Sequence, residues 1–238
     1  ARRVFVASAT VIAVVNLVSA PQVVVLHTVV SRPSTNQFRI IEALAASAQL
    51  LVVMSECARA RLLAVHQDLD PERVVMIPHG AELAVRPVWA GLHRHNPSEC
   101  RLLTWGLIGP GKGIEHVMHA VAELRGEGIP VRYTVAGMTH PKVFRAHGDR
   151  YRESLIELAR DLGIETSVRF DTAYRGVREQ TRFIASADAV VMAYDTTEQV
   201  TSGVLVDSIA AGTPVVATAF PHAVELLARG AGLIVRHG

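Results

Sequence analysis

The chain has 238 residues, of which 50% are hydrophobic and 19% are charged, and its formal net charge is +2. This amount of apolar material supports a sizeable buried core and excludes a disordered chain, while the balanced charge gives no indication of a nucleic-acid-binding surface. The two cysteines, Cys57 and Cys100, are too far apart in the sequence to indicate a disulfide framework, so we expect a reducing, cytoplasmic environment.

The first residues have the general form of a secretory signal peptide, with a short basic start, an apolar stretch over residues 4–15 and small residues near position 20. Three polar residues, Ser8, Thr10 and Asn16, interrupt the apolar run, and no apolar segment reaches the length of a membrane span. We therefore favour a buried element of a domain whose first strands are missing from the chain, and we expect no stable membrane insertion.

Up to residue 80, short apolar runs alternate with amphipathic stretches. The apolar runs predict strands, and the stretches with helical spacing predict helices. The predicted strands cover residues 23–26, 50–54 and 74–77, and the predicted helices cover residues 37–48 and 57–66. Residues 80–100 show little periodicity and contain two prolines and two histidines, which predicts a linker.

From residue 101 the alternation restarts more cleanly. The predicted strands cover residues 102–105, 131–135, 168–170, 189–192 and 215–217, and the predicted helices cover residues 113–124, 151–162, 177–185 and 203–211. Apolar strands that alternate with helices predict parallel sheets covered on both faces. We expect an α/β protein with two doubly wound Rossmann-like units, the first incomplete: a partial N-terminal domain with its linker over residues 1–95, and a ligand-binding C-terminal domain over residues 96–238.

A glycine-rich stretch, here called the glycine loop (residues 106–113), follows a predicted strand and opens a predicted helix. Its glycines, including Gly109 and Gly111, let a ligand's phosphates approach the backbone, and the free amides of the following helix favour an anion. Lys112 adds a positive charge and is one of only two lysines among 24 basic residues. The stretch is neither a P-loop nor a dinucleotide fingerprint, so an anion-binding loop and a plain turn with a surface lysine are both open at this point.

A second candidate site lies where polar residues after the predicted strand 189–192 lead into a helix. Ser202 and Gly203 stand at the start of that helix, whose free amides form a second anion-binding position. Asp207 is a lone acid on an otherwise apolar helix, so its carboxylate needs a polar partner or solvent. By itself the segment is equally compatible with an aspartate on an exposed helix edge.

Four pieces of the sequence, in this order and spacing, resemble the C-terminal domain of the retaining GT-B glycosyltransferases of family 4 (glycosyl transferases group 1). They are the glycine loop with Lys112-Gly113, Thr134-Val-Ala-Gly137, the stretch from Gln199 through Asp207 to Val216, and Gly232-Leu-Ile-Val235. Upstream, residues 25–28, 54–56 and 77–80 resemble the later part of that family's N-terminal domain. The resemblance covers nearly the whole chain from residue 21 onward, and the chain looks truncated at both ends relative to the family.

The resemblance implies that the glycine loop and Lys112 hold the diphosphate of a nucleotide-sugar donor. The family also carries a Glu-x7-Glu signature, whose first acid contacts the donor sugar and whose second acid holds the ribose hydroxyls. In this chain Asp207 occupies the second position and Gln199 the first, so both depart from the signature, and the neighbouring Glu198 is an alternative contact for the sugar. An arginine that often follows the family's first loop glycine is Leu107 here.

His27 follows an apolar run and is expected at the carboxyl end of a strand. It matches a histidine that the family uses near the transferred sugar, and we favour this role over a structural one. His27 and Lys112 are thus the candidate catalytic residues. The candidate donor-binding residues are Gly109, Gly111, Lys112, Glu198, Gln199, Ser202, Gly203 and Asp207.

Two patterns that resemble metal sites are set aside. Asp68-Leu-Asp70 is similar to the metal-binding D-x-D of the other glycosyltransferase fold, but it precedes Pro71 in a polar turn, where aspartate is favoured for capping. His93-Arg-His95 has no acidic or cysteine residues beside it. We therefore expect no metal and no cofactor other than the donor substrate.

The sequence thus predicts a hexosyltransferase-type enzyme that takes a nucleotide-diphosphate sugar as donor and retains the anomeric configuration without a metal. We expect an unidentified glycan, lipid or small-molecule acceptor and no nucleic-acid partner, in the cytoplasm or peripherally at the inner membrane face. Two alternatives stay open: a truncated remnant that binds nucleotide or only folds, and a sugar-nucleotide epimerase of the same fold. The segment with Gln199 and Asp207 favours transfer over epimerisation.

Overall fold

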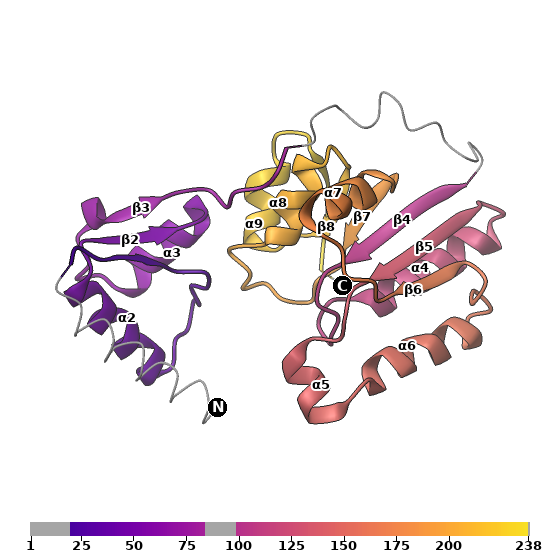
Figure 1. Cartoon of the computed structure of the whole chain (residues 1–238), viewed down its shortest axis with the longest axis horizontal. Coiled ribbons are helices and arrows are strands. Elements are labelled where there is room, and N and C mark those ends of the chain that lie inside the picture. Colours follow the sequence, from indigo (N-terminus) through magenta and orange to yellow (C-terminus); the bar gives the residue numbers. More distant parts are fainter. Residues whose placement is uncertain (1–19, 84–98, 238) are drawn as a thin grey trace. The chain divides into compact units, whose positions relative to one another are not determined.

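The computed structural model describes residues 20–83 and 99–237. Contacts within the chain divide it into two units (Figure 1). The first unit is Ala1–His79 together with Glu198–Thr201, and the second is Gly80–Thr197 together with Ser202–Gly238. The predicted domain boundary at residues 95 and 96, the apolar stretch 4–15 and the two linker histidines lie outside the described residues.

The first unit contains a three-stranded parallel sheet in the order β1-β2-β3. Its strands are β1 (Val23–Val25), β2 (Leu50–Val53) and β3 (Val74–Met76), and its helices are α2 (Thr35–Ser47), α3 (Glu56–Val65) and the 3-10 helix η1 (Pro71–Arg73). The side chains of Val53, Ala58 and Leu62 are fully buried between the sheet and α3. Every predicted strand and helix of this unit is present, each shifted at its ends by one or two residues.

Capping side chains explain where the elements of the first unit begin. The Ser34 hydroxyl accepts from the Gln37 amide at 3.3 Å, and the Gln37 side chain accepts from the Ser34 amide at 2.8 Å, so a capping box starts α2 before its first apolar residue. Ser55 caps α3 in the same way, accepting from the Ala58 amide at 3.1 Å. Asp70 accepts from the Glu72 amide at 2.9 Å, which confirms that it caps a turn.

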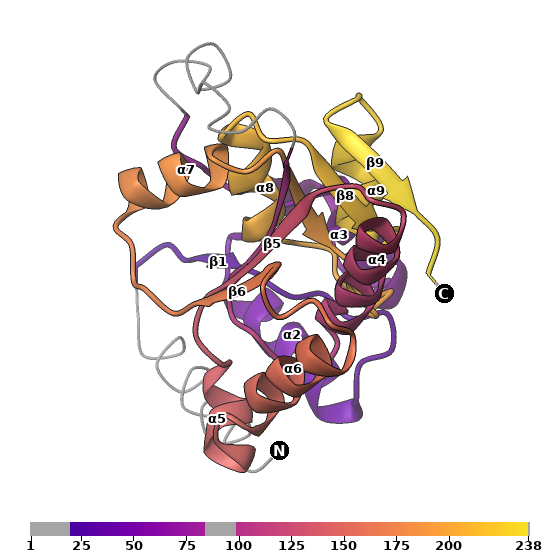
Figure 2. The ribbon, with the colours of Figure 1, turned by 90° about the vertical axis from the view of Figure 1, so that its right-hand side faces the viewer.

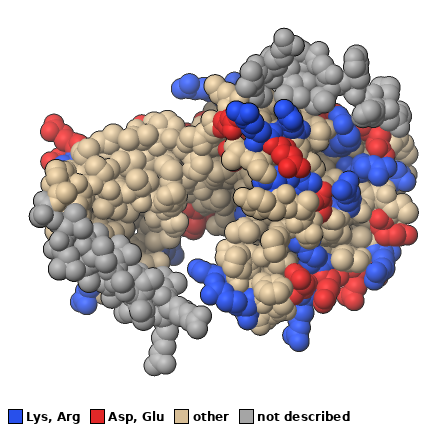
Figure 3. Space-filling model, viewed as in Figure 1, with Lys and Arg blue, Asp and Glu red and all other residues tan. Residues whose placement is uncertain are grey.

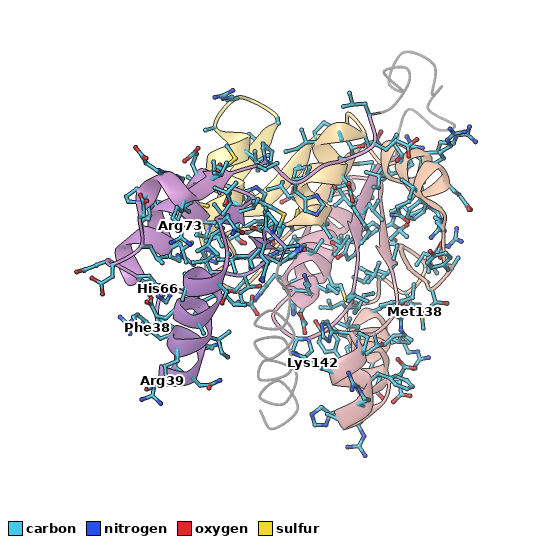
Figure 4. All side chains as sticks on the ribbon, turned by 60° about the vertical axis from the view of Figure 1, so that its left-hand side comes forward. Phe38, Arg39, His66, Arg73, Met138 and Lys142 are labelled. Atoms are coloured by element: carbon cyan, nitrogen blue, oxygen red, sulfur yellow. The ribbon has the colours of Figure 1, made fainter. Side chains whose placement is uncertain are left out.

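Two side-chain contacts hold α2 in the first unit (Figure 4). The guanidinium of Arg73 donates to the carbonyls of Ala45 and Ala48 at the C-terminal end of α2, where the helix dipole favours a cation. On the same helix, the ring of Phe38 stacks on the buried ring of His66 with 4.4 Å between centroids. The helix is therefore fixed at both ends by residues distant in the sequence.

The second unit is built on a six-stranded parallel sheet in the order β6-β5-β4-β7-β8-β9. Its strands are β4 (Cys100–Trp105), β5 (Val131–Ala136), β6 (Val168–Asp171), β7 (Ala189–Met192), β8 (Val215–Thr218) and β9 (Gly232–Val235). Its helices are α4 (Ile114–Gly126), α5 (Pro141–His147), α6 (Arg150–Asp161), α7 (Val177–Ala185), α8 (Gly203–Ala210) and α9 (Pro221–Leu227). The predicted α/β class with parallel sheets is confirmed.

Helices cover both faces of the six-stranded sheet (Figure 2). One buried apolar cluster joins α4 and α6 to the strands, and it includes Met118, Tyr133 and Leu155. A second cluster joins α7, α8 and α9, and it includes Ile184 and Leu205. This double coverage explains why the strands of this unit are almost wholly apolar, as parallel strands buried on two faces are.

Three elements of the second unit were not predicted, namely α5, α9 and β9. The helix α5 has seven residues and no buried side chain, so it carries no apolar stripe, and its ends are set by Pro141 and Gly148. Cys100 was predicted to lie in the linker but forms the first residue of β4, since its amide donates to the Pro130 carbonyl at 2.8 Å. Basic and acidic side chains intermingle on the face of this unit that Figure 3 shows.

Candidate functional site

The order of the strands places two loops of the second unit at a topological switch point. The chain runs from β4 outward to β5 and β6 on one side of the sheet, and from β7 outward to β8 and β9 on the other. The connections after the neighbouring strands β4 and β7 run to opposite sides of the sheet, which leaves a crevice at the carboxyl ends of these strands. Ligands of open α/β sheets bind in such a crevice. In the second unit the glycine loop follows β4, and residues 193–197 and the start of α8 follow β7, so both predicted helix N-termini come after strands that border this crevice.

The glycine loop needs its glycines because of two geometrical demands. Gly111 and Gly113 have φ angles of 83° and 61°, a left-handed region that other residues rarely adopt. A Cβ atom on Gly113 would lie 1.7 Å from the carbonyl oxygen of Ala193, so the loop can rest directly on the backbone after β7. The Asp195 amide also donates to the Gly111 carbonyl at 3.2 Å. The two segments of the crevice are therefore joined backbone to backbone.

Lys112 lies half-buried between these segments. Its Nζ atom lies 3.9 Å from the centroid of the Tyr194 ring, a cation–π contact. Burial lowers the pKa of Lys112 from its ordinary value, because desolvation penalises the ammonium. The Lys112 side chain is therefore folded onto an aromatic ring at the start of α4, while its role toward an anion stays a prediction.

The start of α8 is equally well defined. Ser202 caps the helix, its hydroxyl accepting from the Leu205 amide at 3.3 Å, and Gly203 is the first helical residue. The Ser202 amide donates to Nδ1 of His222 at 2.9 Å, and both residues are buried. Asp207 lies half-buried in the second turn of the same helix. The predicted positions of Ser202, Gly203 and Asp207 on this helix are confirmed, while their roles toward a ligand stay predictions.

Glu198 and Gln199 belong by their contacts to the first unit. The Glu198 carboxylate accepts from the amide and the hydroxyl of Ser31 at 3.0 and 2.8 Å, and it pairs with Arg61 at 3.1 Å. These hydrogen bonds, followed by the charge of Arg61, hold the pKa of Glu198 below its usual value. Gln199 donates from its side-chain nitrogen to the Thr201 carbonyl at 3.2 Å. The structure thus places both side chains in interactions of the first unit.

His27 lies in the first unit, two residues beyond the end of β1. The predicted position at the carboxyl end of a strand is therefore confirmed. The His27 side chain is exposed. The neighbouring Leu26 is buried and closes the strand in the core. The catalytic role of His27 stays a prediction.

A pocket of about 480 Å³ opens in the second unit beside the glycine loop. It is lined by Met138, Thr139, Pro141, Phe144, Arg145, Asp149, Arg152 and Thr172, from the loops after β5 and β6 and from α5 and α6. Met138 projects from the loop before α5, as Figure 4 shows together with Lys142 of that helix. The loop and the pocket wall are in contact, because the His140 amide donates to the Ile108 carbonyl at 2.7 Å.

The polar groups of the pocket offer both a donor and an acceptor. Arg152 donates from Nη2 to the Gly137 carbonyl at 2.5 Å, and its Nη1 atom is buried with no hydrogen-bond partner within the described part of the chain. The Asp149 carboxylate accepts from the Thr139 hydroxyl at 2.6 Å. A buried, unpaired guanidinium nitrogen is costly unless a ligand satisfies it, so this pocket suits a planar group with a carbonyl oxygen.

Sequence reasoning missed three contributors to the crevice and its surroundings. Tyr194 lies two residues beyond β7, where its place near a strand end was visible in the sequence, but its contact with Lys112 depends on the fold. His222 sits on α9, which was not predicted. Arg152 could not be identified, because it is one of many arginines on charged helices.

In residues 20–83 and 99–237, no group of three or more histidine, cysteine or acidic side chains is arranged to hold a metal ion. None of the helices in these ranges is both long enough and apolar enough to cross a lipid bilayer.

Comparison with known proteins gives one family and many structures. A family profile described as glycosyl transferases group 1 matches residues 99–238. No curated protein sequence matches the chain. HepE of Anabaena, crystallised in complex with UDP-glucose, is 19% identical with a TM-score of 0.75, and the match covers 98% of this chain and 63% of HepE.

Two further structures show the same fold at similar identity. A glycosyltransferase from Rickettsia africae is 15% identical with a TM-score of 0.68, covering 93% of this chain and 57% of that protein. A UDP-forming trehalose-phosphate synthase from Burkholderia xenovorans is 14% identical with a TM-score of 0.67, covering 92% and 58%. The chain therefore spans about three fifths of the length of the structures that it matches.

Proposed function

Since the chain belongs to the glycosyl transferases group 1 family, we propose that it transfers a sugar from a nucleotide-diphosphate donor to an acceptor and retains the anomeric configuration. We further propose that it belongs to the retaining GT-B enzymes of family 4. The titles of the HepE structures name UDP and UDP-glucose, so a uridine diphosphate sugar is the first donor to test.

One observation carries this proposal: the glycine loop, Lys112 and the start of α8 converge at the switch point between β4 and β7. Two helix N-termini and an ammonium group at one crevice are suited to a diphosphate. In glycosyl transfer the departing diphosphate gains negative charge as the sugar acquires oxocarbenium character. Fixed amides and Lys112 aimed at that charge would stabilise the transition state more than the ground state.

The pocket beside the glycine loop supports a place for the nucleobase. Its apolar wall, formed by Met138, Pro141 and Phe144, suits the face of a planar ring, and Nη1 of Arg152 can donate to a ring carbonyl. Because the pocket wall is hydrogen-bonded to the glycine loop, a base in the pocket would leave its diphosphate near Lys112.

The remaining candidate residues are proposed from the family resemblance. Asp207 would hold the ribose hydroxyls, and Gln199 or the adjacent Glu198 would contact the donor sugar. His27 would act near the transferred sugar. The Glu198 carboxylate is occupied by Ser31 and Arg61 in this structure. Gln199, at the first position of the family's signature, is therefore the better candidate for contacting the donor sugar.

Calorimetry with UDP tests the proposal most directly. We expect the chain to bind UDP and to bind it equally well with and without EDTA, because the proposed anion site consists of amides and an ammonium group. Uridine and inorganic pyrophosphate should each bind more weakly and compete with UDP, since each fills one half of the site. Binding of UDP that disappears with the chelator would contradict the metal-independent mechanism.

Replacing Asp207 with alanine should weaken UDP binding by about 1.5–3 kcal/mol, the cost of losing a hydrogen bond to a charged group. It should change the free energy of unfolding little, because the side chain is half-exposed on α8. Glu157→Ala, on an exposed position of α6, is the matched control and should bind UDP normally. An affinity unchanged by Asp207→Ala would make Asp207 an ordinary helix residue.

A further inference from the structure

Tyr194 connects the two anion-binding segments of the second unit. It lies two residues beyond the end of β7, and its side chain is only 2% exposed. Its ring carries the Lys112 ammonium at 3.9 Å and stacks on the Phe220 ring with 5.2 Å between centroids. Burial raises the pKa of the Tyr194 phenol, and the neighbouring Ser202 side chain opposes that shift. One buried residue therefore contacts the glycine loop through Lys112 and neighbours Ser202, the N-cap residue of α8.

We propose that Tyr194 is a positioning residue that holds Lys112 and the start of α8 in the geometry that receives the donor diphosphate. The inference rests on the proposed function and deepens it, because it names the group that organises the site before the donor arrives. Tyr194 itself is too deeply buried to touch the donor, so it acts through Lys112 and Ser202.

The physical reason lies in the flexibility of lysine. A lysine side chain has four methylene groups and loses much rotamer freedom when its ammonium is fixed on a ligand. A desolvated cation–π contact limits that freedom in the unliganded protein. A charge that is already in place needs no reorganisation when the donor binds or when charge develops on the leaving group.

The start of α8 is held by a second buried side chain, that of His222. The Ser202 amide donates to Nδ1 of His222, which is 2% exposed, and the Ser202 side chain neighbours the Tyr194 hydroxyl. The backbone of Tyr194 is fixed as well, since its carbonyl accepts from the Thr218 hydroxyl at 2.7 Å. With the Ser202 amide fixed on His222, the amides of Gly203 and Val204 in the first turn of α8 are the ones that can bind an anion.

The chain offers a direct probe of the Lys112–Tyr194 contact, because it contains only two lysines. Reductive methylation with 13C labels Lys112 and Lys142, besides the amino terminus. We expect the methyl signals of Lys112 to lie upfield of those of Lys142, since they sit over an aromatic face while Lys142 is exposed. Tyr194→Phe should keep this shift and Tyr194→Leu should abolish it. The inference would be overturned if the methyl signals of Lys112 and Lys142 coincided in the protein without substitutions, or if the upfield shift of Lys112 survived Tyr194→Leu.

Binding measurements test whether the contact serves the diphosphate. Tyr194→Leu should weaken UDP binding about tenfold and leave uridine binding unchanged, because only the diphosphate half of the ligand uses Lys112. In a Lys112→Ala background the same substitution should have no further effect on UDP. An equal loss in both backgrounds would show that Tyr194 serves only as core packing.

Tyr194→Phe covers the case in which Tyr194→Leu does not fold. Loss of the hydroxyl should weaken UDP binding about threefold in the unmodified sequence and add nothing in a Ser202→Ala background. Equal losses in the two backgrounds would contradict the role of the hydroxyl. Failure of the unmodified chain to bind UDP would instead overturn the proposed function, and with it the diphosphate role of Tyr194, whatever the lysine signals show.

Discussion

Replacing Gly113 with alanine is expected to lower the free energy of unfolding by at least about 3 kcal/mol, or to prevent folding of the second unit. The new Cβ would lie 1.7 Å from the carbonyl oxygen of Ala193, and the residue would have to keep a φ of 61°. The obstacle is backbone at the end of a buried strand, so no side-chain rotation can relieve it. Denaturant unfolding followed by circular dichroism measures the effect.

Gly111→Ala is the matched control two residues earlier in the same loop. Gly111 also has a positive φ, 83°, but a Cβ there would meet no atom within 4 Å. Only the left-handed backbone then opposes the substitution, at a cost of about 1 kcal/mol. If the two variants lose the same stability, the close contact between the glycine loop and Ala193 is not part of the folded protein.

The comparison of these glycines shows what the sequence could and could not predict about the loop. A glycine-rich stretch between a strand and a helix predicts an anion-binding turn, because this follows from backbone freedom and free amides. Which glycine is required by a close approach depends on Ala193, a residue eighty positions later. Such long-range contacts leave no local pattern in the sequence.

The fold was predictable wherever burial imposes a period. Strands such as β5 and β7 and the striped helix α6 were predicted to within a residue, because each shows its buried face as a pattern. The helix α5 has no buried side chain and therefore no such pattern. The start of α2 was placed too late, since the prediction followed apolar spacing while the capping box at Ser34 sets the boundary.

The candidate site was predictable in part for the same reason. Helices with clear sequence signals, α4 and α8, set the positions of four candidate residues. These are Lys112 just before α4, and Ser202, Gly203 and Asp207 at the start of or within α8. The surroundings of Glu198 come from Ser31 and Arg61 on distant segments, so the sequence could not predict them. For this residue the family's motif gave the position in the chain but not the partners of the side chain.

Lys112→Ala should reduce the affinity for UDP by about 2–3 kcal/mol, or roughly 30- to 150-fold, as expected for a hydrogen bond to a charged group. The ammonium is half-buried and held on the Tyr194 ring at the start of α4, so it is screened less by solvent than a surface charge. Thermal unfolding should change little by comparison, because the side chain contributes few apolar contacts. Calorimetry at low salt measures the loss.

Lys142→Ala is the matched control, since it removes the only other lysine of the chain. Lys142 is exposed on α5, beside the pocket but outside its lining. An exposed charge contributes at most about 1 kcal/mol to the free energy of an ion pair. We expect UDP affinity to be nearly unchanged in this variant.

The salt dependence separates a diphosphate contact from a general change in the site. In the unmodified sequence, UDP affinity should fall as salt rises, because ions screen the attraction between Lys112 and the diphosphate. Lys112→Ala should bind UDP with a weaker salt dependence, so the gap between the two proteins should narrow at high salt. Uridine, which carries no phosphate, should bind both proteins alike at every salt concentration. If Lys112→Ala and Lys142→Ala bind UDP equally well, the glycine loop is not the phosphate site, and the proposed donor geometry is wrong.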